Sequence, residues 1–232
     1  VGENPSLLSF DNVVTLFHEF GHAMHGTLTD VTYGSMAGTS GPRDFIELPS
    51  QLLEHWASEP EVLKSFATHY ETGEPIPDEL IEKLLKASKF NQGFINTEYL
   101  AAALLDMDWH TISVNESIKD ANSFEQKSLS EIGLIEEIAA RYRTTYFAHI
   151  FSGGYSSGYY SYVHAAVLDS DGFEAFKEAG DVFDAELSSK LRKHIYEKGS
   201  TEEAMDLYVN FRGRKPIIAP LLKVRGLDGS SD

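Results

Sequence analysis

Residues 11–26, DNVVTLFHEFGHAMHG, are the most informative stretch of this sequence. The apolar side chains recur at the three- and four-residue spacing that one face of a helix requires. Asp11 can cap such a helix, and Gly26 is placed to end it. The sequence therefore predicts an amphipathic helix whose apolar positions are Val13, Val14, Phe17, Phe20 and Met24.

This predicted helix contains an HExxH motif. His18 and His22 are four residues apart, so both imidazoles can point at a single ion, and Glu19 lies beside the remaining coordination position. The pattern predicts a zinc site with a general base next to it. A partly exposed helix with two ordinary histidines is the alternative. We expect His25, three residues further on, at the surface or supporting the ligands from behind.

A catalytic zinc ion needs three protein ligands and one open position. Glu47, in the segment DFIELPSQ at residues 44–51, is the candidate for the third ligand, because its apolar neighbours suggest an inward carboxylate. The alternative is a glutamate near a helix N-terminus that interacts with the helix dipole. Asp44 and Glu54 are candidates to orient the imidazoles. A di-iron site is disfavoured, because Glu-x-x-His occurs only once, at residues 19–22.

A second unusual block, HIFSGGYSSGYYSY, covers residues 149–162. Gly153 and Gly154 give the backbone freedom to approach a ligand, and a histidine with several tyrosines supplies donors for a developing oxyanion. The block predicts a substrate-binding loop, and the alternative is a flexible loop followed by a helix with packed aromatic rings. The candidate donors are His149, Tyr155, Tyr159 and Tyr162.

Composition narrows the classes of function. The chain has 232 residues, with 36 acidic and 19 basic side chains and a formal net charge of −17. Such a surface repels phosphate backbones and anionic lipid heads, so we expect no nucleic-acid or membrane partner. Cysteine is absent, so a metal must be bound by His, Asp, Glu or backbone oxygen. No apolar run approaches the roughly 18 residues of a membrane span, which predicts a soluble protein.

The rest of the chain predicts one mainly α-helical, multi-helical unit with at most a small β element near the zinc helix. The segment 27–42 is expected to be a loop, and residues 31–33 are the one place in it where a short strand could form. An irregular tail with Pro216 and Pro220 is expected from Arg212 onward. The predicted helices cover about 44–56, 61–70, 78–85, 97–112, 124–129, 135–149, 159–168, 172–178, 182–197 and 201–211.

The blocks HEFGHAMH, DFIELPSQ and AHIFSGGYSSGYYSY resemble, in this order, those of the metallopeptidase family that includes thimet oligopeptidase, neurolysin, oligopeptidase A and bacterial peptidyl-dipeptidase. The similarity extends from about Asp11 to Leu227. It implies a zincin-like catalytic domain in which His18, His22 and Glu47 bind one Zn²⁺ ion and Glu19 is the general base. It also implies that four residues beside the glycine loop contact substrate and stabilise the tetrahedral intermediate: His149, Tyr155, Tyr159 and Tyr162.

The amino-acid sequences of these blocks are most similar to those of bacterial peptidyl-dipeptidases, also called dipeptidyl carboxypeptidases. The resemblance thus implies hydrolysis of short peptides with release of dipeptides from the free C-terminus. An endo-acting oligopeptidase of the same family is one alternative, and a non-catalytic zinc-binding or structural fragment is another. Arg141 and Arg143 are candidates to bind the substrate carboxylate, with solvated surface arginines as the stronger alternative.

Family members are much longer and have a large helical region before the zinc helix. Residues 1–232 are therefore expected to be the C-terminal catalytic part of a longer polypeptide, with the upstream region as its partner. The N-terminus does not decide the location. The resemblance favours the cytoplasm, with the periplasm as the alternative.

Overall fold

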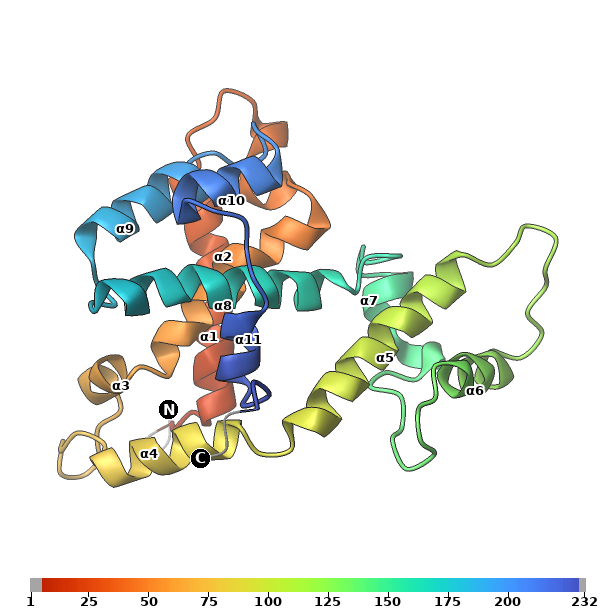
Figure 1. Cartoon of the computed structure of the whole chain (residues 1–232), viewed down its shortest axis with the longest axis horizontal. Coiled ribbons are helices and arrows are strands. Elements are labelled where there is room, and N and C mark those ends of the chain that lie inside the picture. The colour runs from red at the N-terminus through yellow and green to blue at the C-terminus, as the bar shows by residue number, and fades with distance from the viewer. Residues whose placement is uncertain (1–5, 230–232) are drawn as a thin grey trace. The chain divides into compact units, whose positions relative to one another are not determined.

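The computed structural model describes residues 6–229, and this part of the chain consists of eleven α-helices joined by loops and short helical turns, without a β-strand (Figure 1). The expected mainly α fold class is confirmed. Contacts divide the chain into two compact units. Unit 1 comprises the described residues up to 90 and from 165 onward, and unit 2 comprises residues 91–164. Within the described residues, no helix is both long and apolar enough to cross a membrane.

Unit 1 is organised around α2. Its helices are α1 (Phe10–Leu28), α2 (Arg43–Ala57), α3 (Pro60–Phe66), α4 (Asp78–Ser88), α8 (Ser161–Ala179, from residue 165 onward), α9 (Ala185–Leu191), α10 (Ala204–Arg212) and α11 (Ala219–Val224). The apolar face of α2 packs against α8 and α10, which removes large side chains from water and stabilises the unit. The core includes Phe45, Leu48, Leu52, Leu168, Phe176, Leu207, Tyr208 and Phe211.

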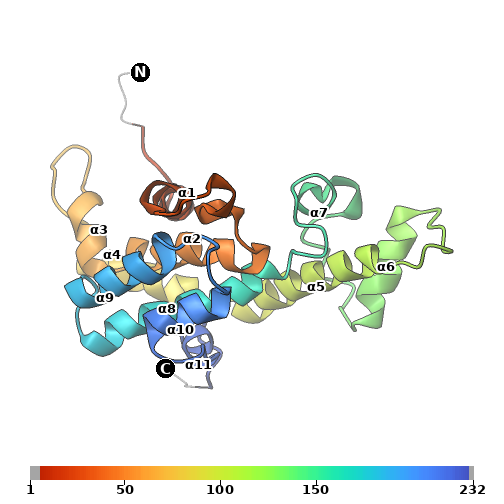
Figure 2. The ribbon, with the colours of Figure 1, turned by 90° about the horizontal axis from the view of Figure 1, so that it is seen from above.

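The first helix lies directly against α2 (Figures 1 and 2). Ser9, rather than the expected Asp11, is its N-cap, because the Ser9 hydroxyl accepts a hydrogen bond from the Asn12 amide at 3.2 Å. Asp11 lies in the first turn instead, where its charge complements the helix dipole. The helix continues past Gly26 to Leu28.

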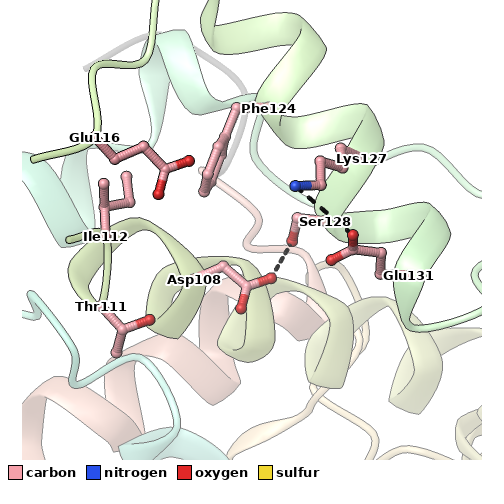
Figure 3. A pocket seen from close by; sticks show the side chains of 8 residues that line it. All are labelled: Asp108, Thr111, Ile112, Glu116, Phe124, Lys127, Ser128 and Glu131. Atoms are coloured by element: carbon pink, nitrogen blue, oxygen red, sulfur yellow. Dashed lines mark hydrogen bonds and ion pairs between the residues drawn. The ribbon is translucent and has the colours of Figure 1, made fainter.

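Unit 2 contains α5 (Gln92–His110), α6 (Ala121–Glu131), the short turn η3 (Thr144–Tyr146) and α7 (Ala148–Phe151). The contacts between α5 and α6 include an aromatic pair and a hydrogen bond. The ring centroids of Trp109 and Phe124 are 4.1 Å apart, and the Ser128 hydroxyl donates to Asp108 at 2.6 Å, beside a pocket between the two helices (Figure 3). None of the predicted site residues lines that pocket.

The short strand expected at residues 31–33 is wrong. The segment leads into two 3₁₀ turns, η1 (Gly34–Met36) and η2 (Gly38–Ser40). A strand needs a neighbouring strand to pair its backbone groups. This loop pairs its groups otherwise: the Gly38 amide donates to the Thr29 hydroxyl at 3.0 Å, and the Met36 carbonyl accepts from the Ser200 amide at 2.9 Å.

The prediction of a helix over residues 135–149 is also wrong. The chain is irregular up to η3, and α7 is only one turn long. Contacts with α6 explain the difference, because the buried Glu125 carboxylate accepts from the Arg143 guanidinium at 2.8 Å and from the Thr144 amide at 2.6 Å. These bonds stabilise an extended path that a continuous helix would not allow.

Two further predictions fail nearer the C-terminus. The tail is not wholly irregular, because α11 forms with Pro220 in its first turn, where proline lacks no needed hydrogen bond. The separate helices expected at 159–168 and 172–178 are one continuous α8. Gly172 lies inside it, where an added Cβ would be 3.4 Å from the Phe211 ring, so a small residue suits the packing.

Candidate active site

The three predicted metal ligands lie together in unit 1. His18 and His22 come from α1, and Glu47 comes from α2. Glu47 Oε2 is 3.4 Å from His18 Nε2 and 3.4 Å from His22 Nε2. The three donor atoms all lie within 4.8 Å of one another, in a group that could hold a metal ion.

These two distances fit ligands of one shared metal ion better than a pair of hydrogen bonds. Ligand atoms about 2.0–2.1 Å from a tetrahedral zinc ion are about 3.3–3.4 Å from each other. A charge-assisted hydrogen bond would bring nitrogen and oxygen to about 2.7–2.9 Å. Two imidazoles and one carboxylate are also a donor set that catalytic zinc sites use, with a fourth position for water or substrate.

Glu47 is deeply buried, with only 2 % of its surface exposed. The Ser50 hydroxyl is 3.1 Å from Glu47 Oε2 and 2.9 Å from the Glu47 carbonyl oxygen. A buried carboxylate is costly without a cation or several donors. The helix dipole acts most strongly in the first turn of a helix. Because α2 begins at Arg43, Glu47 lies beyond that turn. Burial and position favour the ligand role over the helix-dipole alternative.

Gly21 allows the two helices to approach closely enough to form this group. A Cβ at this position would be 2.6 Å from the Pro49 carbonyl oxygen, which is closer than real Cβ contacts come. Gly21 lies between the two histidines in the sequence, and Pro49 lies two residues after Glu47. The close contact therefore sets the distance between the imidazoles and the carboxylate.

Glu54 contacts the imidazole of His18, one of the two candidate metal ligands on α1. Its Oε1 is 2.6 Å from His18 Nδ1, which leaves Nε2 facing Glu47. Burial lowers the pKa of His18, but the Glu54 hydrogen bond and the charges of Glu54, Glu47 and Glu19 outweigh it, and the net pKa is raised. The neighbouring carboxylates thus favour positive charge on the His18 imidazole. Asp44, the other candidate to orient an imidazole, lies in the first turn of α2.

The remaining residues of the motif helix differ in exposure. Glu19 is exposed and follows His18, whose pKa its charge raises. His25 is 1 % exposed, so the expectation of a surface position is wrong. Burial, assisted by His22, lowers the pKa of His25 to about 4. Its ring packs edge-on against Tyr196 at 6.1 Å, and neither ring nitrogen has a hydrogen-bond partner among the described residues.

The predicted donors of the second block come together in unit 2. The His149 ring lies 5.6 Å from the Tyr159 ring and 6.2 Å from the Tyr162 ring. Tyr155 stacks on Tyr162 at 5.2 Å with an interplanar angle of 21°. We call His149, Tyr155, Tyr159 and Tyr162 the aromatic cluster.

Gly153 and Gly154 are each required by the local structure, for different reasons. Gly153 passes so close to α7 that an added Cβ would be 2.9 Å from the His149 Cα. Gly154 has φ of +82°, in the region that favours glycine. Both are exposed, consistent with a loop that a ligand can reach. The Tyr155 amide then donates to the His149 carbonyl at 2.9 Å, which fixes the loop to the short helix.

Tyr159 is the buried member of the aromatic cluster, at 1 % exposure. Its hydroxyl accepts a hydrogen bond from Arg141 Nε at 3.2 Å. Burial and the neighbouring Tyr99 raise the pKa of Tyr159, although Arg141 opposes this. Arg141 also pairs with Glu98 at 3.0 Å, and Arg143 pairs with Glu125 at 2.8 Å. Both guanidinium groups are therefore already matched with carboxylates.

Sequence reasoning missed Asp106, a fully buried carboxylate on α5 whose oxygens bind the amides of Ser157 and Tyr159. A signal was present, because Asp106 directly follows the apolar run 100–105 and precedes His110 at helical spacing. Such a residue is costly to bury without partners. The identity of those partners, about fifty positions away in the sequence, was not predictable from local pattern.

A mainly helical chain with HExxH on one helix and a buried glutamate of the next helix beside both imidazoles has the metal-site architecture of the HExxH metallopeptidases. The model of Peptidase family M3 matches residues 1–227. The chain belongs to this family of metallopeptidases, which confirms the resemblance.

Curated relatives agree with the family. The chain is 45 % identical to dipeptidyl carboxypeptidase of Escherichia coli (strain K12), over 97 % of this chain and 33 % of the relative. It is 39 % identical to oligopeptidase A of the same strain, over 99 % of this chain and 34 % of the relative. Thimet-like oligopeptidase of Dictyostelium discoideum is 34 % identical over 96 % of this chain and 33 % of its own length. The chain spans about a third of the length of these relatives.

Proposed function

We propose that this chain is the C-terminal catalytic part of a zinc metallopeptidase that hydrolyses short peptides and releases dipeptides from their free C-termini. The observation that supports this proposal most directly is the position of Glu47 Oε2, which lies 3.4 Å from Nε2 of His18 and 3.4 Å from Nε2 of His22. His18, His22 and Glu47 would hold the zinc ion. When bound, zinc supplies a Lewis acid for the scissile carbonyl and makes water more acidic.

Glu19 is the proposed general base. It follows a ligand histidine on α1 and is exposed, so a water molecule can reach it. Its carboxylate accepts a proton from the attacking water and then delivers that proton to the leaving amine. Because Glu19 is outside the ligand set, loss of its charge removes proton transfer without removing a ligand.

The aromatic cluster is proposed to bind substrate and to donate hydrogen bonds to the oxyanion. Tyr162 is the favoured donor of the two tyrosines named for this step, because it is only partly buried. Tyr159 is buried and bonded to Arg141, which favours a role in fixing the rings around it. His149 and Tyr155 are proposed to contact substrate, with Gly153 and Gly154 providing the close backbone approach.

The choice of dipeptide release rests on the relatives, since the dipeptidyl carboxypeptidase is more similar than oligopeptidase A, 45 % against 39 % identity. Endo-acting cleavage is the alternative that the second relative favours. Because Arg141 and Arg143 are paired with Glu98 and Glu125, we assign the binding of the substrate carboxylate to neither arginine.

A peptide assay separates these activities. The complete polypeptide, loaded with zinc, is incubated with a short peptide bearing a free C-terminus and with the same peptide amidated, and the products are identified by mass spectrometry. Stepwise loss of dipeptides from the free acid alone supports the proposal. Equal internal cleavage of both peptides supports the oligopeptidase alternative.

The third possibility, a non-catalytic zinc-binding fragment, is tested with the chain alone. We propose that the upstream region of the same polypeptide completes substrate binding. Zinc binding by residues 1–232 without hydrolysis, together with hydrolysis by the complete polypeptide, is the expected pattern. Glu47→Ala should then lower zinc affinity in both forms, because two imidazoles alone hold zinc poorly.

A further inference from the structure

Asp106 lies at the junction between α5 and the loop that presents the aromatic cluster. Its side chain is completely buried, with 0 % exposure. Oδ1 accepts from the Ser157 amide at 3.0 Å, and Oδ2 accepts from the Tyr159 amide at 2.8 Å. His110 Nδ1 is 2.8 Å from Oδ1. All of these groups belong to unit 2.

The two amides lie on either side of Gly158, in an unusual turn. Ser157 has φ of +53°, in the left-handed region that residues with a Cβ rarely adopt. Such a conformation persists only when surrounding contacts fix it. The Asp106 carboxylate supplies such contacts, because each of its oxygens binds one amide of the turn.

The turn determines where three rings of the aromatic cluster lie. Tyr155 precedes it, Tyr159 ends it, and α8 begins two residues later, at Ser161, with Tyr162 in its first turn. Tyr159 is held at its amide by Asp106 and at its hydroxyl by Arg141. A shift of the turn would therefore move Tyr159 and Tyr162 and separate the stacked pair of Tyr155 and Tyr162.

We propose that Asp106 is a positioning residue for peptide hydrolysis, which fixes the left-handed turn at Ser157 and thereby sets the positions of the tyrosines in the aromatic cluster. This rests on the proposed function. The chemistry requires a carboxylate, because two backbone amides must each find an acceptor. An asparagine of the same shape has one acceptor oxygen, and its NH₂ group would face the other amide.

Asp106→Asn in the complete, zinc-loaded polypeptide is the decisive variant. Asp108→Asn is the matched control, because Asp108 lies on the same helix but binds Ser128 of α6. Both variants are compared with the wild type by kcat and KM on a short peptide, by zinc content and by melting temperature. A misplaced catalytic group commonly costs about 10- to 100-fold in rate. We expect that loss of kcat for Asp106→Asn only, with KM and zinc content little changed.

Two further measurements distinguish positioning from general destabilisation. Hydrogen–deuterium exchange in residues 152–162 should be faster in Asp106→Asn than in Asp108→Asn, and this readout does not need activity. Adding Ser157→Gly to Asp106→Asn should restore part of kcat, because glycine adopts a positive φ without the two hydrogen bonds from the turn to Asp106. If Asp106→Asn does not fold, Ser157→Val, which strains the same turn while leaving Asp106 in place, should lower kcat by a similar factor.

The outcomes separate the two proposals. A wild type that takes up zinc but hydrolyses no peptide would contradict the proposed function. Faster exchange in Asp106→Asn would still show that Asp106 holds the turn at Ser157. An active wild type with equal kcat for Asp106→Asn and Asp108→Asn would overturn the positioning role. A lowered melting temperature with unchanged kcat would overturn it as well, and so would normal kcat in Ser157→Val.

Discussion

A Cβ atom on Gly21 would lie 2.5 Å from the Cα atom of Ser50, so the backbones of α1 and α2 meet at this glycine with no room for a methyl group. The contact joins the two segments that contribute the metal-ligand candidates. The geometry of the site therefore depends on a residue that has no side chain to contribute to it.

Gly21→Ala is expected to weaken zinc binding and to destabilise the fold, because α1 must move away from α2. Overpacking of this kind typically costs about 1–3 kcal/mol. Gly26→Ala is the matched control on the same helix, because its Cβ would meet no atom within 4 Å. It should stabilise the helix by about 0.5–1 kcal/mol. Urea unfolding and chelator competition measure both effects, and equal zinc affinity in the two variants would contradict the prediction.

Glu19→Gln should retain zinc and the fold but lose turnover. The substitution keeps the size of the side chain and removes its ability to accept a proton. Loss of a positioned general base typically lowers the rate about 10²–10⁴-fold. Metal analysis, thermal unfolding and kcat are measured on the complete polypeptide. Near-normal kcat with full zinc content would show that another group accepts the proton.

Glu54→Gln tests the carboxylate behind His18. The hydrogen bond and charge of Glu54 raise the pKa of His18 against the effect of burial, so the variant should lower that pKa in metal-free protein. Zinc affinity should fall by about 10- to 100-fold, as for other groups that orient a ligand imidazole. Glu61→Gln, an exposed change of equal charge on α3, is the control. NMR titration and zinc competition provide the two readouts.

His25 should make the fold less stable as the pH falls. In the unfolded chain its pKa is 6.5, whereas burial lowers it to about 4 in the folded chain. The unfolded state therefore binds more protons between these pH values, and unfolding becomes easier toward acid pH. The full loss, reached below pH 4, is about 3 kcal/mol, and about 1.4 kcal/mol of it is expected by pH 5.5.

His25→Leu removes this dependence together with two unpaired buried nitrogens. The free energies of unfolding of metal-free wild type and variant are compared at pH 7.5 and pH 5.5, so that contributions of other groups cancel. The difference between the two proteins should shift by about 1.4 kcal/mol in favour of the variant at the lower pH. An unchanged difference would mean that His25 is not held neutral in the folded state.

The placement of the three metal-ligand candidates was predictable in part, because it depends on helical spacing. Residues four apart on a helix must share a face, so His18 and His22 followed directly from the motif. The apolar surroundings of Glu47 indicated its burial, which the structure gives as 2 % exposure. Gly21 was not recognised as a contact point, since its partner Ser50 lies 29 positions further along the sequence.

The errors arose where tertiary bonds override local preference. The stretch 135–149 has helical character, but Glu125 draws the Arg143 side chain and the Thr144 amide into a different path. Pro220 indicated an irregular tail, although proline in a first helical turn is well tolerated. The role of Arg141 as the partner of Tyr159 was likewise hidden, since no sequence pattern relates them.

Tyr162→Phe should lower kcat by about 10²-fold and change KM much less, because a donor to the oxyanion acts mainly in the transition state. Tyr160→Phe is the control from the same loop, as its ring is 43 % exposed and lies outside the aromatic cluster. Tyr159→Phe removes the hydrogen bond from Arg141 and should lower the free energy of unfolding by about 1 kcal/mol. Steady-state kinetics and urea unfolding of the three variants test this division. The opposite result would be equal kcat for Tyr162→Phe and Tyr160→Phe, with loss of turnover at unchanged stability for Tyr159→Phe. In that case the buried Tyr159 would be the donor, and Tyr162 would serve only to pack against Tyr155.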